Sequence, residues 1–345
     1  MDPLKIIHFS RGPGGVMNEV VRRQLEMGHA VEIYCYPRIT TQDNLIIYNS
    51  KSVKTFGPDI YRTKIGKKQH FELFNLIPFR LFRELNDLIY LSPILRKADV
   101  FHVHGPIFYQ WPKLYSLGLS GWGYAARLNK DLGVVLTIHS GLPSIIKHYK
   151  ALRGEMSFAH QVTAPSKFVT DLINCHHIPN GVDTRFFKPL KREEIDEYRR
   201  WFIGGEKAVI LSVGNWYPVK RHDLLMEILG KLKESVRRQV QVVIAGLLNE
   251  NDRYMKSHYK RAKSVARKYD PVVMFDMGSA YPVHGFNAFV ARDNDQFVEH
   301  LELLLTDEGL RRRMGQNARE SSLAFDWDLI TKRYLEVYHM ALDQR

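Results

Sequence analysis

Short apolar runs alternate with helical patterns along the first half of the chain. The predicted strands span residues 5–10, 30–35, 99–104, 134–139 and 162–165. Between the first two, a glycine-containing turn leads into residues 16–27, whose apolar side chains recur at helical spacing until Gly28 ends the helix. Repeated strand–helix–strand units are typical of a parallel sheet that is covered by helices.

The pattern changes near Pro179-Asn180-Gly181, a turn sequence that precedes a stretch rich in Lys, Arg and Glu. A second alternating region follows, with strands predicted at 208–213, 240–245, 272–275 and 289–291 and helices at 221–232, 252–269, 293–305 and 329–342. We therefore predict an α/β fold with two Rossmann-like domains, residues 1–180 and 181–345, with the last helix returning to the first domain. Facing domains of this type bind a ligand at the carboxyl ends of their strands.

Composition supports a globular chain with an anionic partner. The 345 residues are 45% hydrophobic and carry a formal net charge of +13. The two cysteines, Cys35 and Cys175, form no CxxC motif, and no apolar run reaches the roughly 18 residues of a membrane span. The chain opens almost directly into a predicted strand. We expect a cytoplasmic protein, in a reducing compartment.

The turn at residues 12–15 places Gly14 and Gly15 between a strand and the start of a helix. Free backbone N–H groups and the helix dipole at such a position suit a phosphate, and glycine lets the ligand approach the backbone. A dinucleotide fingerprint would require a third glycine at Met17 and an acidic residue near Cys35, so the sequence disfavours NAD. A tight turn without a ligand remains the alternative.

Three histidines lie on or at the ends of predicted strands. His102 and His104 share one face of their strand, and His139 ends another. Three imidazoles could bind zinc, but no carboxylate or supporting partner has a recognisable spacing. A core role suits His102, whereas the strand-end positions of His104 and His139 favour a role in the cleft. There a histidine can donate to an oxygen or exchange a proton.

Taken in order, eight segments resemble one protein family. They are Gly12-Pro13-Gly14-Gly15-Val16, His102-Val103-His104-Gly105-Pro106, Thr137-Ile138-His139-Ser140, Ala164-Pro165-Ser166-Lys167, Ile178-Pro179-Asn180-Gly181-Val182-Asp183, Leu211-Ser212-Val213-Gly214 with Lys220, Val243-Ile244-Ala245-Gly246, and Met314-Gly315-Gln316-Asn317-Ala318-Arg319 with Phe325, Trp327 and Tyr334. The chain resembles the GT-B glycosyltransferases of family 4, which transfer a sugar from a nucleotide-diphosphate sugar with retained anomeric configuration.

The resemblance implies roles for individual residues. Lys220 matches the lysine that neutralises the leaving diphosphate, His139 a histidine that donates a hydrogen bond near the transferred sugar, and His104 a position near the acceptor. The implied donor-binding residues are Gly14, Gly15, Gly214, Asn215, Lys220 and Arg221. Because a lysine can stabilise the developing charge, the resemblance implies neither an obligatory metal nor a cofactor.

Two features depart from the family pattern. Asn215 stands where the family usually has an arginine, and Arg221 is a candidate substitute. Compared with the family, about 50 residues are missing between Tyr281 and Pro282, roughly two crossover units, which would include the paired glutamates of the E-x7-E motif. Either the native protein has a segment here that this sequence omits, which we favour because no linker joins the two halves, or the deletion is natural. The C-terminal sheet is therefore expected to be short. A catalytically silent GT-B relative that binds a nucleotide or glycan, or serves as a scaffold, is the alternative to an enzyme.

Two basic stretches bear on the acceptor. One helical face carries Arg253, Lys256, Lys260, Lys263 and Arg267, and Lys67, Lys68, Arg80 and Arg83 flank Phe71, Phe74, Phe79 and Phe82. A solvated helix face is the common explanation for the first. Contact with an anionic membrane, next to a glycan or lipid-linked acceptor, is the functional alternative. Nucleic acid is not expected, because no RNA-binding or helix-turn-helix signature is present.

Overall fold

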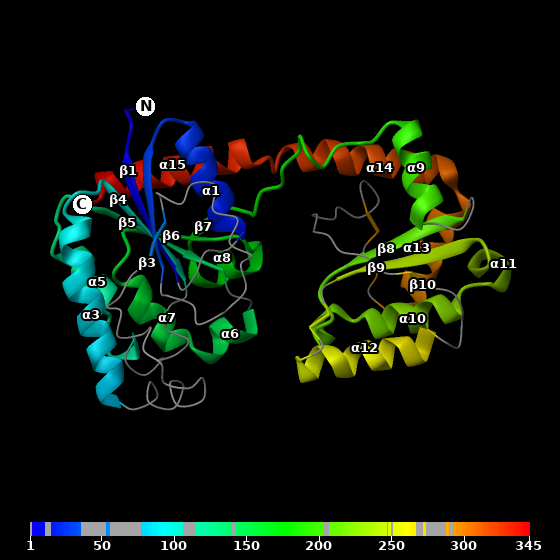
Figure 1. Ribbon diagram of the computed structural model, residues 1–345, viewed down its shortest axis with the longest axis horizontal. Coiled ribbons are helices and arrows are strands. Elements are labelled where there is room, and N and C mark those ends of the chain that lie inside the picture. Colours follow the sequence, from blue (N-terminus) through cyan, green and yellow to red (C-terminus); the bar gives the residue numbers. More distant parts are fainter. Residues whose placement is uncertain are drawn as a thin grey trace. The chain divides into compact units, whose positions relative to one another are not determined.

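The computed structural model of the protein describes residues 2–10, 15–35, 53–55, 77–105, 115–139, 142–202, 207–246, 248–249, 251–266, 272–273, 288–289, 291 and 293–345. They form two compact units (Figure 1). The first unit contains residues 1–183 and 325–345, and the second contains residues 184–324. Each unit has a parallel sheet with helices packed on it, so the predicted α/β class is confirmed.

A parallel sheet forms the centre of the first unit. Its described strands are β1 (Lys5–Ser10), β2 (Ala30–Cys35), β3 (Val53–Thr55), β4 (Val100–Gly105), β5 (Gly133–Ile138), β6 (Gln161–Ala164) and β7 (His176–His177). They lie in the order β3-β2-β1-β4-β5-β6-β7. β1 and β4, which are adjacent in the sheet but separated in the chain, bring the ends of two predicted strands together.

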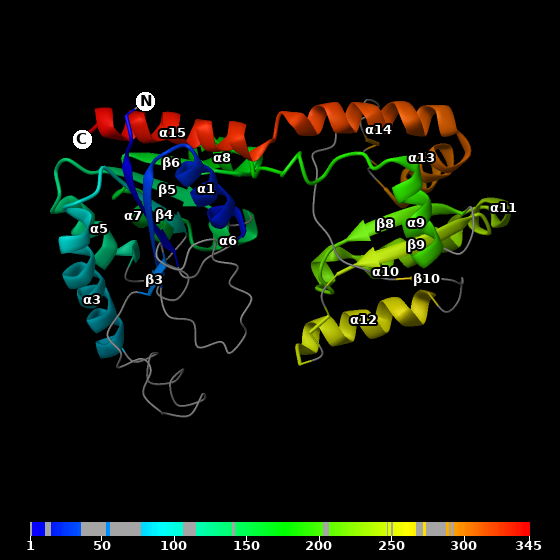
Figure 2. The same ribbon diagram turned by 45° about the horizontal axis from the view of Figure 1, so that its top comes forward.

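Helices cover both faces of this sheet. α1 (Gly15–Glu26) and α15 (Trp327–Asp343) pack on one face, and the other is covered by α3 (Ile77–Leu95), α5 (Gly121–Arg127), α6 (Leu142–Lys147), α7 (Tyr149–Met156) and α8 (Lys167–Ile173) (Figure 2). Side chains alternate across the strands. In β1, Ile7 and Phe9 join the core under α3 and α5, whereas Ile6 joins the core under α1 and α15.

The two chain segments that cross between the units pair with each other. The Val182 N–H donates to the Phe325 carbonyl at 2.8 Å, and the Trp327 N–H donates to the Val182 carbonyl at 3.3 Å. A Cβ atom on Gly181 would lie 2.3 Å from the Trp327 ring, which is buried. The glycine of the Pro179-Asn180-Gly181 turn is therefore required for the indole to pack, which seats the start of α15.

The second unit has a smaller parallel sheet. Its described strands are β8 (Ala208–Val213), β9 (Val240–Ala245) and β10 (Val272–Val273), in the order β10-β9-β8. Its helical segments are α9 (Arg192–Phe202), η3 (Pro218–Lys220), α10 (His222–Lys231), α11 (Glu234–Arg237), α12 (Arg253–Ala266), α13 (Asn294–Thr306) and α14 (Glu308–Leu323). The core joins β8 and β9 to α10, α12 and α13.

The second unit differs from the sequence expectations at α14 and at residues 289–291. α14 was not predicted, because Met314 is its one fully buried residue and its apolar pattern is weak. Phe289 and Ala291, expected in a short strand, lie outside any strand. The junction between Tyr281 and Pro282 lies outside the described residues, so the shortening of the sheet stays a prediction.

Candidate functional site

A row of polar side chains lies on the sheet face that α1 and α15 cover. His8 on β1 pairs in register with His102 on β4, and His104 pairs with Thr137 on β5. His139 follows β5 directly. Because alternate residues of these strands share a face, the apolar positions between them point to the opposite core. The sheet therefore brings the three predicted histidines together and adds a fourth, His8.

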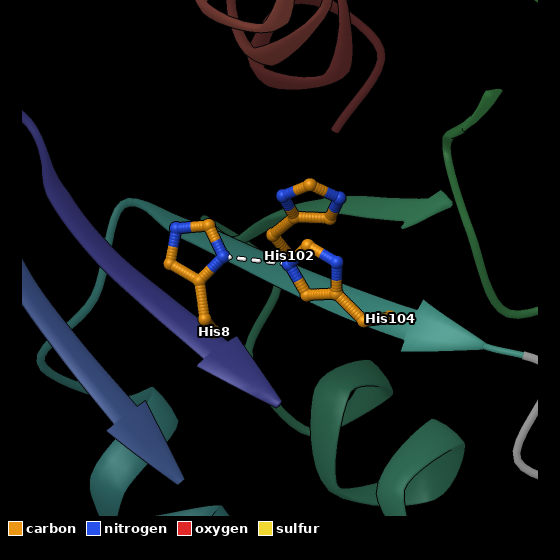
Figure 3. A group of neighbouring side chains, drawn as sticks. All are labelled: His8, His102 and His104. Carbon is orange, nitrogen blue, oxygen red and sulfur yellow. Dashed lines mark hydrogen bonds between the residues drawn. The ribbon is translucent and has the colours of Figure 1, made fainter. Parts of the chain in front are cut away.

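Hydrogen bonds connect these histidines in a chain. His139 Nε2 lies 3.0 Å from His104 Nδ1, and His104 Nε2 lies 2.8 Å from His8 Nδ1. Figure 3 shows the rings of His8, His102 and His104, with a dashed line for the His8–His104 bond. His8 Nε2 donates at 2.8 Å to the carbonyl oxygen of Gln24, a fully buried residue of α1.

The chain continues from Gln24 into α15. The Gln24 amide nitrogen donates to the Tyr338 hydroxyl at 3.0 Å, and that hydroxyl lies 2.7 Å from His102 Nδ1. His102 Nε2 lies 2.7 Å from the Thr137 hydroxyl, which is 2.6 Å from the Thr163 hydroxyl. The side chains of this second half are fully buried. We call the whole set, from His139 to Thr163, the histidine relay.

Burial keeps the rings of the relay neutral. It lowers the pKa of His8 from its ordinary value to about 4, although the bond to Gln24 acts in the opposite direction. Burial also lowers the pKa of His102 and of His104, and the neighbouring histidines add to both shifts. The pKa of His139 is lowered by desolvation too, although this ring still reaches solvent. Near pH 7 each ring thus has one N–H donor and one lone pair.

The geometry bears on the zinc hypothesis. His8, His102 and His104 each have one ring nitrogen that lies within 4.8 Å of a ring nitrogen of the other two. Both nitrogens of each of these rings, however, already have a hydrogen-bond partner within the relay. A metal ion would have to displace these bonds, so the donor set does not fit a zinc site.

A second cluster of predicted residues lies at the end of β8. The stem of Lys220 packs against Gly214, since a Cβ atom at Gly214 would lie 3.1 Å from the Lys220 Cγ and Cδ atoms. His222, buried at the start of α10, bonds through Nε2 to the Gly214 carbonyl at 2.9 Å. That carbonyl oxygen would lie 1.9 Å from a Cβ atom on Gly246, so only glycine fits at the end of β9. The loop after β8 is thereby fixed beside Lys220.

Charges are distributed unevenly around this loop. Among the described residues no carboxylate oxygen lies within 4.0 Å of the exposed Lys220 ammonium. Arg221 lies 3.6 Å from the buried carboxylate of Asp223, which Arg261 approaches at 3.0 Å. Among the described residues, therefore, Lys220 has no acidic partner, whereas Arg221 shares Asp223 with Arg261. The assignment of Arg221 as a substitute for the missing arginine stays a prediction.

The remaining predicted site residues have varied positions. Gly15 begins α1, Gly14 lies outside the described residues, and Asn215 is exposed after Gly214. Sequence analysis did not identify His8 or Gln24. His8 could have been identified, because it is a polar residue in the middle of an otherwise apolar strand. Gln24 could not, because its sequence pattern is the same as that of a glutamine on the solvent-exposed face of a helix.

Comparisons with known proteins identify the family. Glycosyltransferase Family 4 matches residues 11–186, and Glycosyl transferases group 1 matches residues 193–270. No curated protein matches the chain. Within the described part of the chain, no helix is long and apolar enough to cross a bilayer.

Several solved structures share the fold. An α,α-trehalose 6-phosphate synthase from Burkholderia multivorans aligns with a TM-score of 0.63 at 12% identity, covering 98% of each chain. A UDP-GlcNAc 2-epimerase from Neisseria meningitidis aligns with a TM-score of 0.54 at 13% identity, and the alignment covers 96% of this chain and 98% of the epimerase chain. WaaG, a glycosyltransferase involved in lipopolysaccharide biosynthesis, aligns with a TM-score of 0.53 at 13% identity. The alignment covers 96% of this chain and 99% of the WaaG chain.

At these identities the structural likeness shows the fold alone, and the presence of an epimerase illustrates that a fold does not determine an activity. The family match is the stronger finding, since residues 11–186 are slightly more than half of the 345 residues. It agrees with the GT-B architecture of the aligned structures. The chain belongs to glycosyltransferase family 4 and is a GT-B glycosyltransferase.

Proposed function

We propose that this protein transfers a sugar from a nucleotide-diphosphate sugar to a hydroxyl group of a glycan or glycolipid, with retention of configuration. The bond between the anomeric carbon and the diphosphate oxygen breaks, and the nucleoside diphosphate leaves with the electron pair. The acceptor oxygen bonds to the anomeric carbon, and its proton passes to the leaving nucleoside diphosphate. Family membership supports this proposal over a catalytically silent relative.

Lys220 is the observation that carries the proposal. Its charge is exposed, lies beside the glycine that ends β8, and has no acidic partner among the described residues. A fixed cation of this kind stabilises the charge that develops on a leaving diphosphate. In our proposal Gly14, Gly15, Gly214 and Asn215 supply backbone and polar contacts to the donor, and Arg221 adds a second charge. No obligatory metal or cofactor is then required.

The proposal is tested by incubating the purified protein with individual nucleotide-diphosphate sugars and measuring nucleoside diphosphate release. We expect one donor to give release that increases several-fold when a suitable glycan or glycolipid is added. Release from no donor, with any acceptor tried, would count against a transferase.

The acceptor class is proposed from the surface of α12. Lys256, Lys260 and Lys263 are exposed on this helix, while Met255 and Ala262 are buried beneath it. Of the basic stripe expected from the sequence, Arg253 is exposed as well, and Arg267 lies outside the described residues. The Phe-rich stretch was the second part of the prediction, but its side chains lie outside the described residues. A basic face suits an anionic membrane surface that carries a lipid-linked acceptor, at the cytoplasmic side.

We expect the protein to bind vesicles that contain phosphatidylglycerol and not vesicles of phosphatidylcholine alone. Binding should weaken as salt rises, because exposed charges are screened beyond about 10 Å at about 0.1 M salt. Changing Lys256, Lys260 and Lys263 together to Gln should weaken binding, measured by vesicle sedimentation.

The matched control removes three positive charges from the surface of the first unit. Lys130, Lys332 and Arg333 are exposed in the first unit, and their joint change to Gln should leave more of the binding intact. Equal losses in the two triple variants would show that net charge, and not the basic face of α12, is responsible. Equal binding to neutral vesicles would remove the membrane proposal.

A further inference from the structure

The histidine relay has a direction, and Gln24 lies at the point that decides it. A carbonyl oxygen can only accept a hydrogen bond, so the His8 nitrogen that meets Gln24 Oε1 at 2.8 Å must carry a proton. His8 is neutral, so its other nitrogen, Nδ1, has a lone pair. The side-chain amide of one residue on α1 therefore determines the tautomer of a ring on β1.

The tautomer of His8 in turn determines the tautomers of His104 and His139. Because His8 Nδ1 accepts, His104 Nε2 must donate across the 2.8 Å separation. His104 is neutral too, so its Nδ1 accepts from His139 Nε2 at 3.0 Å. The neutral His139 ring is then left with its lone pair on Nδ1, an atom that makes no hydrogen bond within the described part of the chain.

The inner half of the relay continues in the same direction. Gln24 Nε2 donates to Tyr338, whose hydroxyl must then donate to His102 Nδ1 at 2.7 Å. His102 Nε2 donates in turn to Thr137. Every donor thus points the same way from His139 to Thr137, and hydrogen bonds aligned in this manner strengthen one another. Rotating the Gln24 amide by a half-turn would reverse every bond in the chain.

We propose that Gln24 is a positioning residue that fixes His139 as the Nε2–H tautomer, so that its Nδ1 accepts a hydrogen bond from a hydroxyl group of the substrate. This inference rests on the proposed function and on the place beside the transferred sugar that the family resemblance implies for His139. It makes His139 the acceptor of the hydrogen bond, whereas the resemblance implied that His139 donates it. The rings of His104 and His139 are nearly parallel, with an interplanar angle of 8°, as suits a hydrogen bond between their edges.

A purely structural role for these side chains predicts something different. If these hydrogen bonds only satisfy buried polar groups, the proton on His139 can lie on either ring nitrogen. His139 would then sample both tautomers. The proposal requires a single tautomer at His139 and its dependence on Gln24. The nitrogen chemical shifts of the imidazole rings distinguish a protonated from an unprotonated nitrogen, and they do not depend on sugar transfer.

The test compares wild type with Gln24→Met and Thr331→Val in long-range proton–nitrogen spectra of isotope-labelled histidine, with assignment by the His139→Gln variant. In the wild type at neutral pH we expect Nε2–H on His8, His104 and His139. Gln24→Met removes both polar groups at similar volume, and the His139 shifts should move toward a mixture of tautomers. Thr331→Val changes a buried hydroxyl on α15 that has no hydrogen-bond partner among the described residues, and should leave the shifts unchanged.

Sugar transfer provides the second readout. We expect Gln24→Met to lower kcat by about tenfold, the equivalent of one hydrogen bond, while the KM for the donor changes little. If Gln24→Met does not fold, the wild-type spectrum alone decides. A wild-type His139 with Nδ1–H or with mixed tautomers, or a Gln24→Met protein with the wild-type tautomer, would overturn the proposal. Because the spectra need no substrate, failure of the relay and failure of the transferase assignment give separate results.

Discussion

Replacing Lys220 by Ala is expected to lower kcat for sugar transfer by about 100-fold or more, the effect typical of losing one group that stabilises charge in a transition state. The physical reason is the position of this ammonium, beside Gly214 and without an acidic partner among the described residues. Stability should change by no more than about 0.5 kcal/mol, because the side chain is exposed. Turnover and denaturant unfolding measured on the same preparation separate the two effects.

Lys188→Ala is the matched control, since it removes an exposed lysine of the same unit that belongs neither to the candidate site nor to the basic face of α12. Lys220→Arg retains the charge with a different geometry and should recover part of the activity. A folded Lys220→Ala protein with wild-type turnover would remove Lys220 from the reaction and, with it, the observation on which the proposed mechanism rests.

His139→Ala is expected to lower kcat by about 10- to 100-fold, since a hydrogen bond that is complete in the transition state is lost. A chelator should leave the native enzyme unaffected, because the nitrogens of His8, His102 and His104 are already engaged in hydrogen bonds. Turnover with and without the chelator, together with elemental analysis, checks both statements.

His177→Ala is the control for this experiment, because His177 is exposed on β7, at the edge of the same sheet. Its replacement should leave turnover close to that of the wild type. Stoichiometric zinc in the purified protein, with loss of activity or stability on chelation, would show that the rings bind a metal instead.

Much of the fold could be predicted because buried parallel strands have a clear local signal. β1, β2, β8 and β9 coincide with the predicted runs, and β4, β5 and β6 differ from them by one residue. β3 and β7 were missed, since three and two residues are too short to show a period. The amphipathic pattern of α15 was visible, but its start at Trp327 depends on packing over Gly181, which lies far away in the sequence.

The candidate site was predictable only in part, for a related reason. His104, His139 and Lys220 lie at strand or turn positions where the sequence itself indicates chemistry. The relay also needs Gln24 and Tyr338, which are separated by 314 positions and meet only because α1 and α15 cover the same sheet face. Likewise, the ion pairs that Arg221 and Arg261 both make with the buried Asp223 could not be read from the sequence. Such partnerships follow from tertiary packing and leave no local pattern.

Retention of configuration is the part of the account that one measurement tests most directly. The purified protein is incubated with its donor and an acceptor, and the one-bond carbon–proton coupling at the anomeric centre of the newly formed glycoside is measured by NMR. We expect the product to have the same anomeric configuration as the nucleotide-diphosphate sugar. A product of inverted configuration would contradict the proposed retaining transfer.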